Sequence, residues 1–200
     1  MPAAADKPAD HELAFAIMRD GAQIGRHEVA FHRDGARLDV DMRGEVTFKV
    51  AFVTLYRYQQ RRTERWDNGK LLSFTAWTDD DGAVTELSGT RSGDNFSIVS
   101  DNGARQIAGD AIPDNFWPLA TISTSRLIDN TTGEAYPISV TGGAIEQIQT
   151  GEGPIEARRY HVEGGRGHEI ARDLWYDDQG RWVRMELTAR DGSTIQFVLK

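Results

Sequence analysis

The chain alternates hydrophobic and polar residues over short stretches, which are separated by tight-turn dipeptides. Leu13, Phe15 and Ile17, for example, alternate with small or polar residues. A period of two puts successive side chains on opposite faces, so these stretches predict β-strands with one apolar face. The predicted fold is an antiparallel meander, because the separating dipeptides supply the positive φ angles of hairpin turns. They are Asp20-Gly21, Asp34-Gly35, Asn68-Gly69, Asp81-Gly82, Asn102-Gly103 and Asp191-Gly192.

The alternation continues near the C-terminus. One predicted face carries Val183, Met185 and Leu187, and the opposite face carries Trp182, Arg184 and Glu186. The whole chain contains roughly ten to twelve such segments, the number at which antiparallel sheets curl into barrels or split into two layers.

The longest segment, 46–66, contains neither glycine nor proline. It exceeds an ordinary strand of about 5 residues and predicts a strongly bent or bulged pair of strands. One of its faces begins with valine and phenylalanine and ends with Tyr56, Tyr58, Gln60, Arg62, Glu64 and Trp66.

The meander is interrupted between about residues 110 and 133. Pro113 and Pro118 flank an aromatic pair, and the spacing of Ile122, Leu127 and Ile128 is compatible with one or two helical turns. We therefore predict an all-β fold: an antiparallel meander that forms a barrel or half-barrel, with one short helix capping an opening. Residues 11–200 would form a single domain.

Composition supports one folded domain and narrows its partners. The chain has 200 residues, of which 39% are hydrophobic and 27% charged, a balance typical of a globular protein. Its net charge of -8 disfavours nucleic acid as a partner. It contains no cysteine, which excludes disulfides and thiolate metal sites, and no apolar run long enough to predict a transmembrane helix.

Residues 1–10 are small or polar and show no pattern. They are typical of what remains after a signal peptide has been removed, with Met1 added for expression. This predicts a disordered N-terminal remnant on a periplasmic or secreted protein. The alternative is the frayed N-terminus of a cytosolic protein.

No motif predicts a metal, a cofactor or a catalytic residue. The five histidines include no His-x-His pair, and the serines lack a Gly-x-Ser-x-Gly elbow. We therefore expect no metal site and no cofactor, and we name no catalytic residue.

The polar end of segment 46–66 is the main candidate for ligand binding. Tyr56, Tyr58, Arg62, Glu64 and Trp66 share one predicted face, and hydroxyl-tipped aromatic rings with guanidinium groups can fix a carboxylate or sugar hydroxyls in an apolar pocket. If this face lines an interior, Arg62 and Glu64 would form a partly buried ion pair. If it projects past the rim of the sheet, the same charges only keep an edge soluble.

Two further features bear on a ligand. Arg57, Arg61, Arg62 and Arg65 concentrate positive charge on this segment, so an anionic small molecule is a plausible ligand despite the acidic chain. Trp117 is a sixth candidate, either as the wall or lid of a cavity mouth or as a core residue that plugs the end of the barrel.

The chain resembles an uncharacterised family of exported bacterial β-proteins, a domain of unknown function. The resemblance rests on Phe15-x-Ile17-x-Arg19-Asp20-Gly21-x-x-Ile24-Gly25, Glu64-x-Trp66-x-x-Gly69-x-Leu71, Leu174-Trp175-Tyr176-Asp177-x-x-Gly180 and Asp191-Gly192-Ser193. The layout is similar to the curved sheets of periplasmic lipoprotein carriers. The resemblance implies export and a curved antiparallel sheet around a cavity, and it transfers no catalytic residue.

These observations favour a non-catalytic periplasmic or secreted protein that binds an apolar or amphipathic small molecule. Tyr56, Tyr58, Arg62 and Trp66 would orient an acidic head group near the mouth of the cavity. The first alternative is an enzyme, an isomerase, cyclase or hydrolase, with Glu64 as general acid or base and Tyr58 or Arg62 stabilising negative charge. The second is a structural or interaction protein of the cell envelope. The sequence does not fix the oligomeric state.

Overall fold

A computed structural model describes residues 10–50, 53–101, 103–165, 170–189 and 191–200. The predicted N-terminal remnant, apart from Asp10, lies outside the described residues. The strands form one 15-stranded sheet in the order β8-β7-β6-β5-β4-β3-β2-β1-β15-β14-β13-β12-β11-β10-β9. Within the described part of the chain, no helix is long and apolar enough to span a membrane.

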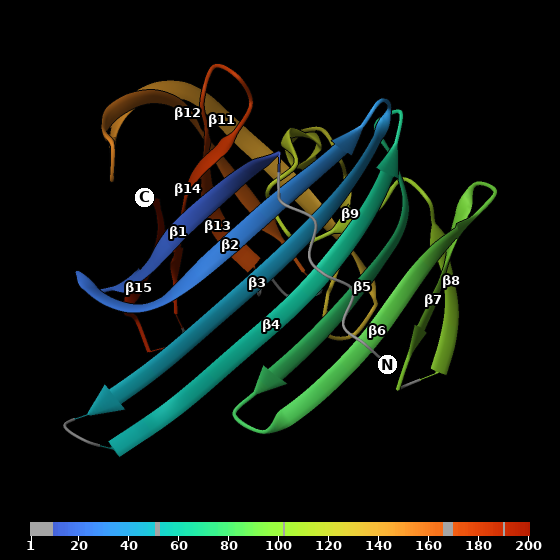
Figure 1. Cartoon of the computed structure of the whole chain (residues 1–200), viewed down its shortest axis with the longest axis horizontal. Helices are drawn as coiled ribbons and strands as arrows, with labels where there is room; N and C mark the ends of the chain where they lie inside the picture. The colour runs from blue at the N-terminus through green and yellow to red at the C-terminus, as the bar shows by residue number, and fades with distance from the viewer. Residues whose placement is uncertain (1–9, 51–52, 102, 166–169, 190) are drawn as a thin grey trace.

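The first half of the chain is a run of antiparallel hairpins (Figure 1). Its long strands are β1 (His11–Arg19), β2 (Ala22–Asp34), β3 (Arg37–Val50), β4 (Val53–Asp67), β5 (Lys70–Asp80) and β6 (Ala83–Ser92). Two shorter strands, β7 (Asn95–Ser100) and β8 (Gly103–Ala108), complete it.

The second half begins with two very short strands, β9 (Ile112–Pro113) and β10 (Arg126–Ile128), which pair in parallel. It continues antiparallel through β11 (Ala135–Thr150), β12 (Gly153–Gly164), β13 (Ile170–Tyr176), β14 (Trp182–Thr188) and β15 (Thr194–Leu199). β15 pairs with β1, for instance Ile17 with Phe197, so the first and last strands lie side by side in the middle of the sheet.

The predicted turns lie between consecutive strands, although Asn102 itself is outside the described residues. Asp20 and Gly21 have φ angles of 48° and 85°, and Asp81 and Gly82 have 52° and 94°. Both central residues therefore have positive φ, as two-residue hairpins require. The antiparallel meander that these dipeptides predicted is confirmed.

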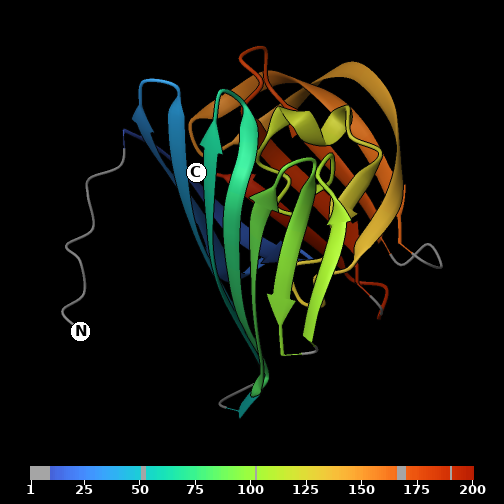
Figure 2. The same cartoon turned by 90° about the vertical axis from the view of Figure 1, so that its right-hand side faces the viewer.

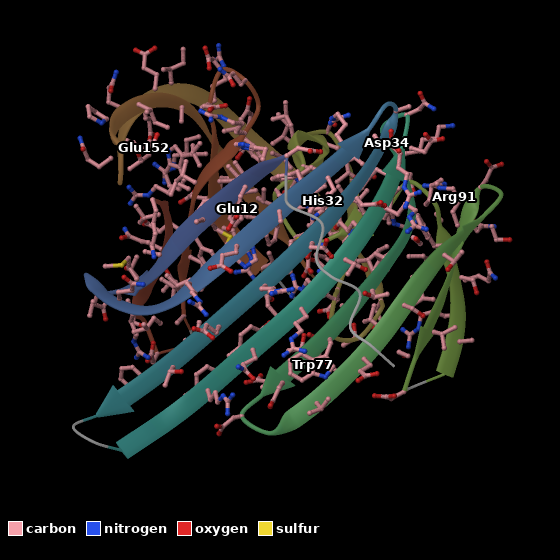
Figure 3. All side chains as sticks on the ribbon, viewed as in Figure 1. Glu12, His32, Asp34, Trp77, Arg91 and Glu152 are labelled. Carbon is pink, nitrogen blue, oxygen red and sulfur yellow. The ribbon has the colours of Figure 1, made fainter. Side chains whose placement is uncertain are left out.

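The sheet curves but does not close, because β8 and β9 are its two ends. Residues 109–134, which we call the inserted segment, follow β8 and include β9 and β10. Figure 2 shows the inserted segment between strands β5–β8 on one side and β11–β12 on the other. Arg91, labelled in Figure 3 on β6, holds the start of this segment: it donates to the backbone oxygens of Leu71 and Gly109, each at 2.7 Å.

One main core covers the inner face of the sheet, the face that the inserted segment contacts. Phe15, Val29 and Met42 from β1–β3 are at most 1% exposed, and the inserted segment adds Leu127 and Ile128, both fully buried. A second, smaller core lies on the opposite face of β11–β14 and contains Ile148, Ala157, Trp175 and Val183.

One sequence prediction about strands was confirmed and another was wrong. Segment 46–66 is a bulged pair of strands, as predicted, since Val50 of β3 pairs with Val53 of β4 and the register shifts between Phe48 and Lys49. Val183 does not share a face with Met185, because the register shifts so that Tyr176 pairs with Trp182 while Trp175 pairs with Arg184. This bulge turns Trp182 into the main core and Val183 into the second core.

The inserted segment differs from the predicted short helix. It contains one 3₁₀ turn, η1 (Leu119–Ile122), between β9 and β10. The two prolines and the serine- and threonine-rich sequence around this turn do not sustain an α-helix. The 15 strands also exceed the predicted ten to twelve, because the sequence signal for β9 and β10 is only two or three residues long.

Gly89 of β6 provides a test of core packing. It pairs with Phe74, whose ring lies over it so closely that an added Cβ would be 2.1 Å from a ring carbon. We predict that Gly89→Ala lowers the free energy of unfolding by about 1–3 kcal/mol, because Phe74 has to move within a packed core. Urea unfolding measures this loss. Ser88→Ala, on the exposed face of the same strand, is the control, and an equal effect of both substitutions would contradict this packing.

Candidate functional site

The alternation along β4 decides where the candidate residues point. Gln60, Glu64 and Trp66 are 9%, 2% and 6% exposed, so this face is turned to the interior. Tyr56, near the far end of the strand, is 36% exposed. Glu64 and Trp66 therefore do not project past the rim of the sheet, and the interior alternative holds for this part of the strand. The other face carries Arg57, Arg61 and Arg65, all exposed, so only Arg62 brings positive charge inside.

The carboxylate of Glu64 accepts hydrogen bonds from three side chains, which with it we call the Glu64 cluster. The indole nitrogens of Trp66 and Trp117 both donate to Oε2, at 2.8 and 2.9 Å, and the amide of Asn115 donates to Oε1. The two indole rings meet edge to face, with their centroids 5.7 Å apart. Trp66 shares β4 with Glu64, whereas the other two donors come from the inserted segment.

The backbone between those two donors is strained. Phe116 has a φ of 61°, in the left-handed region that a bulky side chain rarely adopts. Its carbonyl oxygen accepts a hydrogen bond of 2.6 Å from the hydroxyl of Tyr176, which helps to hold this conformation. The reversal at Phe116 lets both of its neighbours, Asn115 and Trp117, reach the same carboxylate.

The predicted ion pair between Arg62 and Glu64 is not formed directly. Asn115 lies between them: its oxygen accepts from Arg62 at 2.6 Å, and its nitrogen donates to Glu64. The oxygen of Asn115 also accepts from Asn130 at 2.9 Å. The sequence prediction missed this arrangement because the bridging residue is more than 50 positions away along the chain.

A second buried carboxylate, Asp114, lies beside the Glu64 cluster. It accepts hydrogen bonds from the amide of Asn130 and, at 3.3 Å, from the hydroxyl of Tyr136. Burial raises the pKa of both Asp114 and Glu64 above the ordinary range. The positive charge of Arg62 opposes this rise in both pKa values, and so do the hydrogen bonds that the two carboxylates accept from nitrogen donors.

An apolar cleft opens beside Trp117. Its volume is about 320 Å³, and large hydrophobic side chains line it from β1–β3, the inserted segment and β14: Leu13, Phe31, Leu38, Trp117, Leu119 and Trp182. Asp10, His11, Arg33 and Arg181 also line it, and the carboxylate of Asp10 accepts a hydrogen bond from the backbone of Arg33 at 2.6 Å. Arg181 is paired with Asp177 at 2.6 Å, while the guanidinium of Arg33 has no partner among the described residues.

A smaller polar cavity of about 180 Å³ lies on the other side of Trp182, which lines both spaces. Tyr58, Arg62, Asp114 and Arg172 are among its polar lining residues. It also has an apolar wall, formed by Ile17, Val46, Met185, Leu187 and Phe197.

A chain of neutral side chains forms another part of this lining. The Tyr58 hydroxyl donates to the Gln60 oxygen at 3.1 Å, and the Gln60 nitrogen is 3.1 Å from Nδ1 of His27. Gly44 lies between the two strands that carry Gln60 and His27, and an added Cβ would come within 3.0 Å of both side chains. Burial, assisted by the charge of Arg62, lowers the pKa of His27 to about 3, so this histidine is neutral at physiological pH.

A comparison with protein families assigns the chain to one of them. A model of a family described as "Domain of unknown function (DUF6134)" matches residues 15–200. The chain belongs to the DUF6134 family. The predicted membership of an uncharacterised family of β-proteins is thereby confirmed, and the export of this DUF6134 protein stays a prediction. No curated protein matches the chain.

Solved structures show the fold of this DUF6134 protein. The crystal structure of a beta-barrel-like protein of domain of unknown function DUF1849 from Brucella abortus matches with a TM-score of 0.69 and 11% identity, over 98% of this chain and 97% of that chain. A DUF1089 family protein from Pseudomonas aeruginosa gives a TM-score of 0.35 and 15% identity, over 78% and 87% of the two chains. The first likeness supports a shared fold, and the second supports no conclusion.

The six candidate residues of the DUF6134 chain thus fall into separate environments. Tyr58 and Arg62 line the polar cavity, and Trp117 lines the apolar cleft. Glu64 and Trp66 are buried behind Trp117 and line neither space, and the half-exposed Tyr56 lines neither space as well. No group of three or more metal-binding side chains gathers among the described residues.

Sequence reasoning missed Asn115, Asn130, Asp114 and Arg172. The first three follow no periodic pattern in the inserted segment. Arg172 reads as an ordinary polar position in a strand. The aromatic pair Phe116-Trp117 between two prolines was the one signal near these residues.

The Glu64 cluster predicts a stability loss for Glu64→Gln. A glutamine amide offers one acceptor oxygen and one donor nitrogen, so its nitrogen would face the donor of Asn115 or one of the indole donors. We expect the free energy of unfolding to fall by about 1–3 kcal/mol, the cost of one buried donor left unpaired. Urea unfolding followed by tryptophan fluorescence measures it.

Glu12→Gln is the matched control, since Glu12 is an exposed glutamate on β1 (Figure 3). We expect it to change stability by less than about 0.5 kcal/mol. If Glu64→Gln were equally harmless, a charged acceptor at position 64 would not hold the inserted segment.

His27 predicts a pH dependence. The unfolded chain takes up a proton near the ordinary pKa of 6.5, whereas folded His27 stays neutral down to about 3. His27 therefore stabilises the fold above pH 6.5, and this contribution is lost as pH falls below it. Glu64 and Asp114, whose pKa values are raised, act in the opposite sense, so comparison with His27→Gln is needed to isolate the effect.

We expect the destabilisation by His27→Gln to shrink by about 2 kcal/mol between pH of about 7.5 and about 5. A constant difference in the unfolding free energies over that range would contradict a neutral buried His27.

Proposed function

We propose that this protein binds an apolar or amphipathic small molecule with an acidic head group in the apolar cleft, without catalysing a reaction. The observation that carries the proposal is the cleft itself, about 320 Å³ in volume and lined by Phe31, Leu38, Trp117 and Trp182. Ligand pockets typically start at about 300 Å³ and have mostly hydrophobic and aromatic walls with a few polar groups. The resemblance to exported β-proteins extends the proposal to the periplasm or the cell exterior.

Contacts outside the cleft hold its Trp117 wall in place. Trp117 is anchored through its indole nitrogen by Glu64, and its ring contacts Phe31 edge to face with 5.2 Å between centroids. A tryptophan held at both its polar tip and its ring loses little conformational entropy when a ligand packs against it. The Glu64 cluster thus supports a preformed wall rather than a movable one.

The charge at the rim supports an acidic head group. Arg33 is exposed, lines the cleft, and has no ion-pair partner among the described residues. Leu119 of η1 lies at the same rim and is 43% exposed. η1 would thereby take the place of the predicted capping helix, as a short turn beside the opening. An unpaired guanidinium next to exposed apolar surface suits a ligand with a carboxylate and a hydrocarbon tail.

The enzyme alternative has less support. Glu64, its proposed general acid or base, lines neither cavity, and both of its oxygens are occupied by donors. A catalytic carboxylate needs to reach a proton of the substrate within hydrogen-bond distance. No observation on the described residues favours the envelope-interaction alternative over ligand binding.

Decanoate tests the proposal as a defined amphipathic probe. We expect it to bind the wild-type protein, and Leu119→Glu to weaken binding by about tenfold or more, because a carboxylate at the rim repels the head group and removes apolar contact. Isothermal titration calorimetry measures both affinities.

The matched control is Ile145→Glu, which makes the same change at a residue 58% exposed and outside the cleft. It should bind decanoate like the wild type. The proposal fails if decanoate does not bind, or if both variants bind it as tightly as the wild type.

A further inference from the structure

The polar cavity holds two guanidinium groups that lack a full set of partners. The Nε atoms of Arg62 and Arg172 are both buried without a hydrogen-bond partner. Arg62 donates one hydrogen bond to Asn115. The guanidinium of Arg172 lies over the ring of Phe116, with its Cζ atom 5.4 Å from the ring centroid. A buried charged donor without an acceptor is costly, and both of these arginines line the same polar cavity, which indicates a role beyond packing.

Neither arginine is neutralised by a direct ion pair within the described residues. Arg184 makes a useful contrast: its Nε is also unpartnered, but its charge is paired with Glu186 at 3.2 Å. Glu64 and Asp114 are the carboxylates whose charges interact with that of Arg62. Their oxygens already accept hydrogen bonds from other donors. The two guanidinium groups therefore retain donors for an acceptor from outside the chain.

The rest of the cavity restricts what that acceptor can be attached to. The side chains of its apolar wall, Ile17, Val46, Met185, Leu187 and Phe197, offer no hydrogen bonds. Such a wall fits a hydrocarbon body better than a fully hydrated ion like phosphate.

His27 and its partners add no competing charge. Its Nδ1 is next to the Gln60 amide, whose oxygen accepts from Tyr58. A neutral imidazole adds no charge, so the charged side chains that line the cavity are Arg62, Arg172, Asp114 and Glu45. Glu45 lines the cavity too, and it is paired with Arg26 at 3.1 Å.

The volume sets the size of the ligand. An engineered cavity of about 150 Å³ in another protein holds one benzene molecule, and the polar cavity measures about 180 Å³. It can therefore take a ring-sized apolar body with a carboxylate. Trp182 separates this space from the apolar cleft.

We propose that the polar cavity is a second binding site, which takes a small monocarboxylic acid whose carboxylate lies between Arg62 and Arg172 and whose hydrocarbon body packs against the apolar wall. Charge-assisted hydrogen bonds from two guanidinium groups supply the affinity and select the ionised acid. This site is distinct from the cleft and does not depend on the function proposed for it.

Benzoate, benzyl alcohol and inorganic phosphate are the probes for a test by calorimetry. Benzoate carries both the ring and the charge, benzyl alcohol the ring alone, and phosphate the charge alone. We expect benzoate to bind about tenfold or more tightly than either of the others, as the loss of a charged hydrogen bond or of apolar contact implies. Equal binding of benzyl alcohol, or no binding of benzoate, would overturn the proposal.

Arg172→Met locates the site. This substitution keeps much of the side-chain bulk and leaves the contact of Arg62 with Asn115 in place, and we expect it to weaken benzoate binding by about tenfold or more. Arg126→Met, an exposed arginine of β10, is the control and should bind benzoate like the wild type.

Leu119→Glu separates the two sites, since it changes the rim of the cleft and should leave benzoate binding unchanged. If benzoate binding is insensitive to Arg172→Met or is lost in Leu119→Glu, the polar cavity is not its site. Neither outcome changes the interpretation of decanoate binding to the apolar cleft.

Discussion

The buried carboxylate of Glu64 is the interaction on which the rest of the structure depends. A carboxylate in an apolar interior is tolerated only when donors satisfy it, and two of its three donors, Asn115 and Trp117, lie more than 50 residues away along the chain. The Glu64 cluster therefore ties the inserted segment to the inner face of β4, beside the hydrogen bond from Arg62 to Asn115. Any shift of that segment would leave the charge uncompensated, which explains why the strained backbone at Phe116 persists.

This attachment leaves the interior partly open on both sides. Trp117 forms a wall of the apolar cleft, while Asn115 and Phe116 line the polar cavity, and Trp182 stands between the two spaces. The cleft has a largely hydrophobic lining with Asp10, Arg33 and Arg181 as its charged residues, and the cavity holds Arg62 and Arg172 together with Asp114. A sheet that curves without closing can hold ligands of different chemistry in this way, because the inserted segment rather than the sheet alone shapes the walls.

The sequence predicted the meander because its signals are local. Asp81-Gly82 and the other dipeptides require hairpin turns, and period-two alternation orients Glu64 and Trp66 to one face. What it could not predict depends on contacts between distant segments. The connection of β3 to β4 has no turn residue, the bulge at Val183 leaves no mark in the sequence, and the bridge through Asn115 exists only because the inserted segment returns to the sheet. Arg172 likewise lies on a strand more than 100 residues after Arg62, so only the folded chain shows that the two arginines line one cavity.

Native mass spectrometry of the protein purified from its own host, without detergent, tests the central claim most directly. If the spaces on either side of the Glu64 cluster serve to bind ligands, the folded protein should carry an additional mass, and extraction should release an apolar or amphipathic acid. Recovery of only the mass of the chain itself, from preparations that remain folded, would contradict the account.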